Sequence, residues 1–319
     1  MKTSRRLLPL TWIAALSLSA SAGAQVPKSV SPTLQIKDIP VQTQRGEGKG
    51  RYVPPVPTKA DLPTLWLIGD STVRNGSGGD NGPEGQWGWG GPIAAFIDLT
   101  RVNLVNRALG GTSSRSFYNA NWKEMKPSIK KGDFVMIQFG HNDGGRPEGV
   151  YPQGRGSLNG SGEETREVET TPGTKEVVHT FGWYLKQYVD EAKAQGATSV
   201  ICSFTAREAW NPDGTFKSGG SYATWAAEVA KNTNTLYLPL NETISARYQV
   251  LGKAKVETFF VPAPKESLHT GWDGAVVNAE CVIAGLKALP GDPLGKFLND
   301  RARPIAPWTA KPADVLPAR

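Results

Sequence analysis

Four short polar stretches contain residue types that could act together in a chemical reaction. They are GDST, with Ser71; NRALGGTSSRSF, with Gly111; FGHND, with Asn142; and ESLH, with Glu266 and His269. A serine hydroxyl attacks an ester efficiently only when a base removes its proton, and histidine titrates in the right range to be that base. A carboxylate three residues before the histidine could hold the imidazole in the required tautomer. The stretches therefore predict nucleophilic attack by Ser71 with His269 as the base.

Each stretch also has a simpler structural explanation. Ser71 is a good helix N-cap, and Asn142 is a good turn residue. Gly110 competes with Gly111 as the glycine whose missing Cβ would let the backbone approach a substrate. Asp70 is expected to be a structural hydrogen-bonding partner rather than a catalyst. On any one stretch alone, these explanations compete with the catalytic one.

The other two histidines of the chain are interpreted as structural. His141 stands next to Asn142 but has no carboxylate at a useful spacing. His179 is expected to begin a helix and to pack against Trp183, and Asp143 is expected to be a turn residue. This leaves His269 as the predicted base.

The elements that would position these residues alternate between strands and helices. Short apolar runs predict buried parallel strands at 65–69, 102–106, 133–140, 198–205 and 235–240. Helical patterns lie at 91–99, 177–195, 222–233 and 274–289. This alternation predicts a doubly wound α/β sheet, in which ligands bind at the carboxyl ends of the strands. Because the polar stretches all fall at that edge, the catalytic interpretation is favoured.

The chain divides into four predicted regions. Residues 1–24 have a basic start, a short apolar stretch and small residues before the expected cleavage site, which predicts a signal peptide and an exported protein. The apolar stretch is too short to span a membrane. Residues 25–62 form an extended leader, 63–290 the catalytic domain and 291–319 a Pro-rich tail. Within the domain, 144–178 is predicted to be a long loop, which is usually a functional feature.

Charge, cysteines and histidines exclude several classes of function. Removing residues 1–24, with three basic and no acidic residues, lowers the formal net charge from +7 to +4. A mild positive charge suits an acidic polymer without requiring one, and no nucleic-acid-binding signature is present. Cys202 and Cys281 could form a disulfide after export, but two buried free thiols are favoured. The dispersed histidines and the lack of a phosphate-binding loop predict no metal and no cofactor, and the oligomeric state cannot be read from the sequence.

The four polar stretches, in this order, resemble the sequence blocks of the SGNH (GDSL) hydrolases. QWGWG, SSRSF, IQFGHNDGG and TAREAW narrow the resemblance to rhamnogalacturonan acetylesterases, a branch of the carbohydrate esterases of the family 12 type. The resemblance covers roughly residues 63–290. It implies a three-layer α/β sandwich around a five-stranded parallel, flavodoxin-like sheet.

The resemblance also assigns roles. It implies that the backbone N–H groups of Ser71 and Gly111 and the side-chain amide of Asn142 form the oxyanion hole. It implies an esterase that removes O-acetyl groups from a plant cell-wall polysaccharide, most specifically rhamnogalacturonan, through an acetyl-enzyme intermediate. Candidates for gripping the sugar, besides the loop 144–178, are Trp89, Arg115 and Arg207.

Two questions stay open on the sequence alone. The family usually has aspartate where this chain has Glu266, so the third triad member could be Glu266, Asp273 or a backbone carbonyl that leaves a Ser-His dyad. The substrate could instead be xylan, another acetylated glycan or a lipid. A non-catalytic carbohydrate-binding protein on the same scaffold is the alternative from a different class.

Overall fold

The computed structural model describes residues 34–39, 54–74, 85–260 and 266–310. The predicted signal peptide lies outside the described residues, and so does most of the leader. Within the described residues, no helix is both long and apolar enough to cross a membrane.

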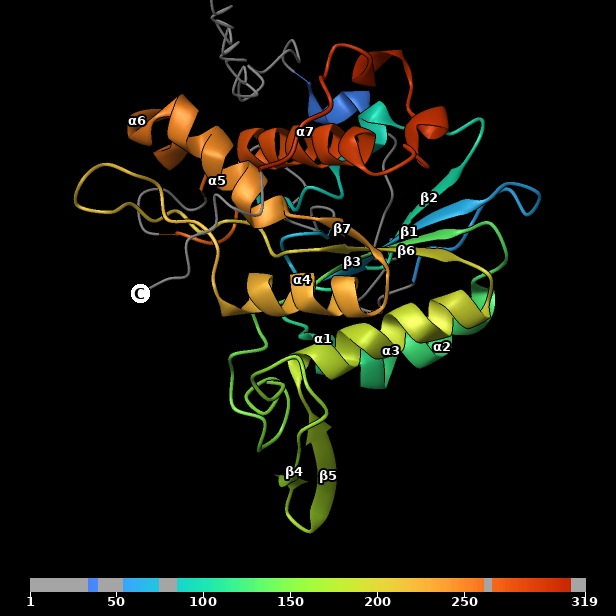
Figure 1. The fold of residues 1–319 in the computed structure, drawn as a ribbon, viewed down its shortest axis with the longest axis vertical. Helices are drawn as coiled ribbons and strands as arrows, with labels where there is room; N and C mark the ends of the chain where they lie inside the picture. Colours follow the sequence, from blue (N-terminus) through green and yellow to red (C-terminus); the bar gives the residue numbers. More distant parts are fainter. Residues whose placement is uncertain (1–33, 40–53, 75–84, 261–265, 311–319) are drawn as a thin grey trace, which may run out of the picture.

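A five-stranded parallel sheet forms the centre of the fold (Figure 1). The strand order β2-β1-β3-β6-β7 places the first strand between the second and third, as in flavodoxin-like sheets. On β1, for example, Leu65 is paired with Leu104 on one side and with Phe134 on the other. The strands are β1 (Thr64–Gly69), β2 (Asn103–Asn106), β3 (Phe134–Gln138), β6 (Thr198–Cys202) and β7 (Leu236–Leu238). The predicted α/β class and sheet are confirmed.

Helices cover both faces of this sheet (Figure 1). Two hydrophobic clusters, one on each face, account for the continuous burial of the strands. One face is covered by α1 (Ser114–Phe117), the π-helix η4 (Tyr118–Trp122), α2 (Lys123–Met125), the short 3₁₀-helix η5 (Lys126–Ser128), α3 (Phe181–Ala194) and α4 (Ser221–Asn232). The other is covered by η3 (Pro92–Phe96), α5 (Leu240–Leu251), α6 (Lys253–Glu257) and α7 (Trp272–Ala288).

Helix α7 fixes the loop that precedes it. The helix is apolar almost all round, and it lies across the sheet face to reach η3. At its first turn the Trp272 indole Nε1 donates to the carbonyl of Leu34, 2.6 Å away. Just before it, the Thr270 hydroxyl donates to the carbonyl of Trp87 at 2.9 Å. The segment that carries His269 is therefore anchored at its C-terminal end.

Some predicted helices differ from the observed ones. The pattern at 177–195 was expected to be helical throughout, but it begins in a strand, and α3 starts only after Thr180, whose hydroxyl accepts from the N–H of Trp183. The pattern at 91–99 yields only the 3₁₀-helix η3. Helix α5 was not predicted. Polar residues such as Asn241 and Glu242 are buried on the side of this helix that faces the core, so the sequence lacks the apolar periodicity of an amphipathic helix.

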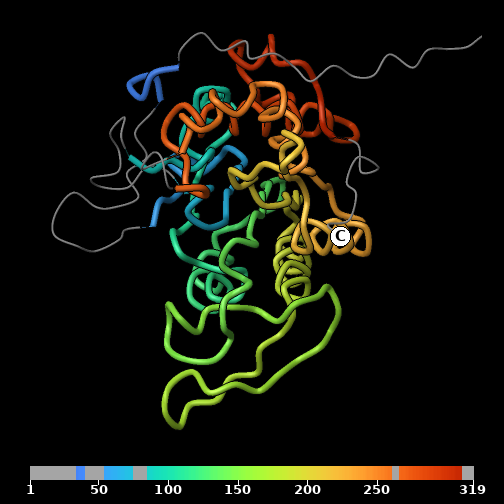
Figure 2. Tube along the Cα trace, turned by 90° about the vertical axis from the view of Figure 1, so that its left-hand side faces the viewer, coloured from blue at the N-terminus to red at the C-terminus, as the bar shows by residue number. Residues whose placement is uncertain are grey.

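The prediction of a loop over residues 144–178 is wrong for its second half. The antiparallel strands β4 (Thr165–Thr171) and β5 (Thr174–His179) form a hairpin that extends away from the sheet, as Figure 2 shows from a second direction. Because most side chains of both strands are exposed and many are charged, the sequence has no apolar alternation to reveal them. We refer to residues 144–179 as the insertion.

The described part of the C-terminal tail packs on the domain. It contains the 3₁₀-helices η6 (Gly295–Phe297) and η7 (Asp300–Ala302), and a third, η1 (Ile36–Asp38), lies in the leader. The N–H of Asp98 donates to the carbonyl of Phe297 at 2.7 Å, and the N–H of Trp308 donates to that of Ala284 at 3.0 Å. The tail thus closes over η3 and α7.

Candidate active site

The structure brings Ser71 and His269 into direct contact. Ser71 is the second residue after the end of β1, and His269 lies in the loop before α7. The Ser71 Oγ and His269 Nε2 atoms are 2.8 Å apart; Ser71 is buried, with 9% of its surface exposed, and the His269 side chain is 23% exposed. With the ring proton on Nδ1, the Nε2 atom accepts the serine hydroxyl hydrogen, which is the arrangement that activates a serine.

Glu266 occupies the position of the third triad member. Its Oε2 lies 3.2 Å from His269 Nδ1, and its Oε1 accepts from the N–H groups of Leu268 at 2.6 Å and His269 at 3.2 Å. Burial acts to raise the pKa of Glu266, but these donors outweigh it, so the pKa lies below its usual value. The carboxylate is therefore charged at neutral pH and oriented toward the imidazole. Asp273 is exposed in the first turn of α7 and has no hydrogen bond to His269 among the described residues.

The nucleophile turn has a backbone that only glycine allows at its start. A Cβ on Gly69 would lie 2.5 Å from a Val73 methyl and 2.6 Å from the Gln138 carbonyl oxygen. Asp70 Oδ1 then accepts from the N–H and the hydroxyl of Thr72, each at 2.8 Å, which closes a tight turn. Residues 71–74 form this turn rather than the first turn of a helix, so the expected strand-to-helix junction and the N-cap explanation do not fit. Asp70 is structural, as predicted.

A series of buried side-chain hydrogen bonds supports this turn. The Gln138 amide Nε2 donates to the Thr72 hydroxyl at 2.7 Å, and its Oε1 accepts from the Trp89 indole at 2.7 Å. The backbone N–H of Trp89 also donates to the backbone carbonyl of Thr72. Trp89 is only 1% exposed, so it cannot grip sugar as predicted. Its indole instead positions the turn that carries Ser71, through Gln138, a residue that no sequence pattern singled out.

The two other predicted oxyanion residues lie on neighbouring loops. Gly111 has a φ of +80°, a left-handed conformation that favours glycine, whereas Gly110 does not. The Asn142 amide Nδ2 donates to the carbonyl of Thr112 at 2.9 Å, which ties its loop to that of Gly111. An amide nitrogen carries two hydrogens, so one remains for an oxyanion. The contribution of both residues to an oxyanion hole stays a prediction.

Asp143 lies in a turn, as predicted, but its side chain is fully buried. Its carboxylate accepts from the N–H and hydroxyl of Ser114, at 3.1 and 2.5 Å, and from the Ser157 hydroxyl at 3.1 Å. Burial raises its pKa to about 6 in spite of these donors. Asp143 thus joins the Asn142 loop, α1 and the insertion.

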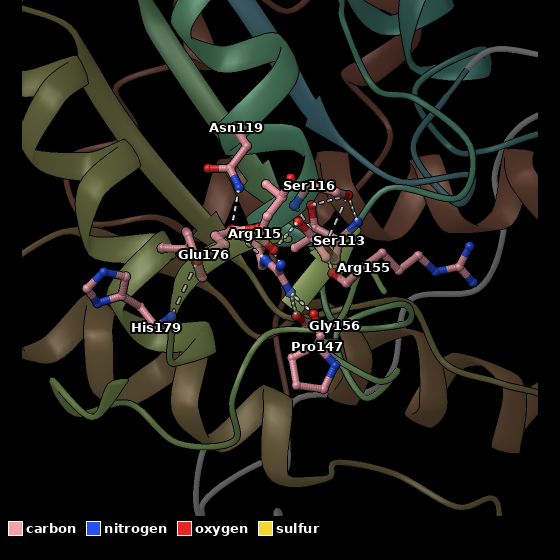
Figure 3. A network of polar contacts seen from close by, with 12 residues as sticks. Ser113, Arg115, Ser116, Asn119, Pro147, Arg155, Gly156, Glu176 and His179 are labelled. Atoms are coloured by element: carbon pink, nitrogen blue, oxygen red, sulfur yellow. Dashed lines mark hydrogen bonds and ion pairs between the residues drawn. The ribbon is translucent and has the colours of Figure 1, made fainter. Parts of the chain in front are cut away.

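Arg115 pins the insertion to α1 (Figure 3). Its Nε and Nη2 donate to the two oxygens of Glu176 at 2.8 and 2.5 Å, and its Nη1 donates to the carbonyls of Pro147 and Gly156. The side chain is 3% exposed. Arg115 lines a cavity of about 480 Å³, but its donors are already engaged by protein groups. The predicted role in gripping sugar therefore does not fit its position.

Arg207 is the one sequence-predicted sugar ligand that the structure leaves exposed beside the site. The N–H of its neighbour Glu208 donates to the carbonyl of Ser267 at 2.8 Å, which joins this loop to that of His269. Burial, followed by the charges of Arg207 and His269, lowers the pKa of His141 to about 3. His141 contacts the Thr205 hydroxyl at 3.1 Å and is a neutral structural residue, as predicted.

The remaining predicted residues lie away from the site. His179 ends β5 instead of beginning a helix, and its ring stacks on Trp183 with centroids 3.7 Å apart, so the predicted packing is confirmed. Cys202 and Cys281 are buried free thiols, and burial raises the pKa of each. Among the described residues, no group of three or more His, Cys, Asp or Glu side chains could hold a metal ion.

Residues 67–258 match the GDSL-like lipase/acylhydrolase family, and this range holds Ser71, Gly111 and Asn142. The chain belongs to this family and is a carboxylic ester hydrolase. It is 31% identical to the rhamnogalacturonan acetylesterase of Emericella nidulans over 74% of this chain and 88% of that protein. It is 28% identical to the probable rhamnogalacturonan acetylesterase YesY of Bacillus subtilis, over 70% of this chain and 93% of YesY.

A solved structure shares the fold. The YxiM protein of Bacillus subtilis superimposes with a TM-score of 0.58 at 24% identity. The match covers 71% of this chain and 56% of the length of YxiM.

Proposed function

We propose that this protein removes O-acetyl groups from rhamnogalacturonan, the acidic polysaccharide of pectin. The observation that carries the proposal is the Ser71–His269–Glu266 arrangement, in a chain whose relatives include rhamnogalacturonan acetylesterases.

In the first half of the reaction, the Ser71 oxygen attacks the acetyl carbonyl carbon while His269 Nε2 takes the hydroxyl proton. The charged Glu266 beside Nδ1 stabilises the imidazolium that forms. The carbonyl oxygen becomes an oxyanion, for which the Ser71 and Gly111 N–H groups and the Asn142 amide are the proposed donors. His269 then gives its proton to the sugar oxygen, the C–O bond breaks, and an acetyl-enzyme remains.

In the second half, His269 takes a proton from a water molecule that attacks the acetyl-enzyme. The same donors hold the second oxyanion. When it collapses, the proton returns to Ser71 and acetate leaves. Both halves need only one base, because the proton that His269 removes in each half is the one that it later donates.

The charge of the site supports an acidic substrate. Arg207 is exposed next to the His269 loop and forms no ion pair among the residues that the structure covers. We propose that it contacts the polysaccharide. The formal net charge of +7, or +4 without residues 1–24, also attracts an acidic polysaccharide at long range.

The proposal is tested by measuring acetate release from acetylated rhamnogalacturonan and from acetylated xylan, with Ser71→Ala as the inactive control. We expect a higher kcat/KM on rhamnogalacturonan. A preference for xylan would assign another glycan, and absence of any ester hydrolysis would leave a carbohydrate-binding protein. A burst of p-nitrophenol from p-nitrophenyl acetate in the first turnover, when deacylation is the slower half, is the expected sign of the acetyl-enzyme.

We further propose that the protein is exported, on the signal-peptide pattern of residues 1–24. The mature chain should then begin at Gln25 when the protein is recovered outside the cytoplasm and its N-terminus is sequenced. An N-terminus at Met1 on the recovered protein would contradict this.

A further inference from the structure

Two side chains of the insertion lie directly against the proposed oxyanion glycine. A Cβ atom placed on Gly111 would be 3.4 Å from the hydroxyl oxygen of Tyr151 and 3.6 Å from Nη1 of Arg155. Neither residue was singled out from the sequence. The insertion thus forms one wall of the candidate site.

The backbone around Arg155 is fixed to the two loops that carry the proposed oxyanion donors. The Ser113 hydroxyl donates to the carbonyl of Arg155 at 2.5 Å, close to Gly111 along the chain. The N–H of Ser157 donates to the carbonyl of Asp143, next to Asn142, at 3.1 Å. The origin of the Arg155 side chain is therefore held in register with the site, as a specificity-determining residue requires.

The guanidinium of Arg155 is not neutralised by the protein. Two nearby arginines differ from it in having carboxylate partners, since Arg115 is paired with Glu176 at 2.5 Å and Arg166 with Glu148 at 3.1 Å. In the part of the chain that the structure describes, no ion pair or side-chain hydrogen bond is formed by Arg155. Figure 3 shows its side chain pointing away from the Arg115 network.

An arginine fork matches a carboxylate in both geometry and charge. We propose that Arg155 binds the carboxylate of a uronic acid in the substrate and so selects acidic over neutral acetylated polysaccharides. This inference rests on the proposed function. Tyr151, 53% exposed, supplies a ring for the apolar face of a sugar. Beyond it, the cavity of about 480 Å³ between α1 and the insertion, lined also by Gly110, Thr112 and Gly154, has room for the next sugar of the chain.

The test removes the charge from each partner in turn. The substrates are acetylated galacturonic acid oligosaccharides with free carboxylates and the same compounds as methyl esters. We expect the wild-type enzyme to prefer the free acid, mainly through a lower KM, and Arg155→Gln to reduce that preference about 10- to 100-fold. Arg155→Lys, which keeps the charge without the fork, should restore part of it.

Arg101→Gln is the matched control. Arg101 is exposed, whereas Arg155 is half-buried, and Arg101 stands just before β2, at the edge of the sheet opposite the carboxyl ends of the strands. The substitution changes the net charge by the same amount as Arg155→Gln but should leave the preference for the free acid unchanged. If Arg101→Gln and Arg155→Gln lost the same amount of preference for the free acid, the preference would come from long-range charge, and the assignment of the carboxylate to Arg155 would be overturned.

Three other results would also overturn it. A wild-type enzyme that hydrolyses both oligosaccharides equally well has no carboxylate site, whatever the behaviour of the variants. A loss in Arg155→Gln of equal size on both oligosaccharides would mean that Arg155 serves the oxyanion or the fold, and the melting curve separates those two. A preference that survives in a folded Arg155→Gln enzyme would place the carboxylate elsewhere. A different result would contradict the proposed function itself: the enzyme would hydrolyse p-nitrophenyl acetate but release no acetate from any acidic glycan.

Discussion

The Nε2 atom of His269 lies 2.8 Å from the Oγ atom of Ser71, although 198 positions separate the two residues in the chain. Ser71 lies in the turn after the first strand, β1, and His269 lies in the loop before the last long helix, α7. The contact therefore depends on the whole sheet between them, and each test of the site should be accompanied by a measurement of folding.

Ser71→Ala should reduce kcat by more than about a thousandfold, because the nucleophile is lost while binding remains. The melting temperature should change little, since among the described residues the Oγ of Ser71 is hydrogen-bonded to His269 alone. Ester hydrolysis and thermal unfolding are measured on the same preparation. Ser199→Ala is the matched control, because it removes from β6 a buried hydroxyl that has no hydrogen-bond partner among the described residues. Retention of most activity in Ser71→Ala would disprove the mechanism.

Glu266→Gln should lower kcat by several orders of magnitude, because a neutral amide cannot stabilise the imidazolium next to it. Glu266→Asp should keep partial activity. Asp273→Asn should alter the melting temperature more than kcat, since Asp273 lies at a helix N-terminus and does not contact His269. Near-normal kcat in Glu266→Gln would show that His269 is oriented by the backbone alone.

Asn142→Ala should reduce kcat by about 10²–10³ with little change in KM if its amide holds the oxyanion. The substitution also breaks the hydrogen bond to the carbonyl of Thr112. Thr112→Val, which removes a nearby hydroxyl but keeps that carbonyl, controls for disturbance of the loop. An effect of Asn142→Ala confined to KM would indicate that the amide positions sugar instead.

Trp89→Phe should destabilise the fold by about 1–3 kcal/mol, because the buried Oε1 of Gln138 loses its donor. The KM for polysaccharide should stay close to that of the wild type, since the indole is buried beneath the nucleophile turn. Chemical denaturation and steady-state kinetics measure the two effects. Trp225→Phe, at an indole with no hydrogen bond among the described residues, provides the comparison. If Trp89→Phe raised KM without loss of stability, Trp89 would be a sugar-binding residue after all.

Asp143 should make stability depend on pH. Burial raises its pKa to about 6 in the folded protein, above the ordinary 3.8, so the folded state holds the proton more tightly than the unfolded state. Its contribution to the free energy of unfolding should be largest below pH 3.8, fall as the pH rises through 6, and level off above that. The fall is roughly 3 kcal/mol for this shift.

Denaturation of wild type and Asp143→Asn across this range isolates that contribution. The variant should be less stable at every pH, because its amide nitrogen cannot accept from Ser114 or Ser157. The stability difference between the two proteins should be greater at pH 4 than at pH 7. A constant difference would mean that Asp143 titrates near its ordinary value.

The sheet could be predicted from the sequence because its strands are buried on both faces. Such strands appear as continuous apolar runs, and β1 is one. The hairpin β4–β5 and helix α5 were missed for the opposite reason. Exposed charges in the hairpin and buried polar residues in α5 leave no periodicity for a pattern to detect.

The candidate site was predictable only where residue type carries the chemistry. Ser71, His269 and Glu266 could be proposed because few side chains can fill those roles. The buried positions of Trp89 and Arg115 could not, because burial depends on partners such as Gln138 and Glu176 that are distant in sequence. Arg155 was missed because an arginine in a polar segment has no distinguishing signal until the chain folds it against Gly111.

The course of helix α7 across the sheet has a consequence for when the enzyme can act. During synthesis the nucleophile emerges from the ribosome in the first quarter of the chain, whereas the base emerges only near the end. A nascent or truncated chain that ends before His269 has a serine without an activating histidine, and one that ends before α7 lacks the helix that anchors the His269 loop. If the chain crosses a membrane unfolded, hydrolysis begins only after α7 has docked at the destination, so the cytoplasm is never exposed to the active enzyme.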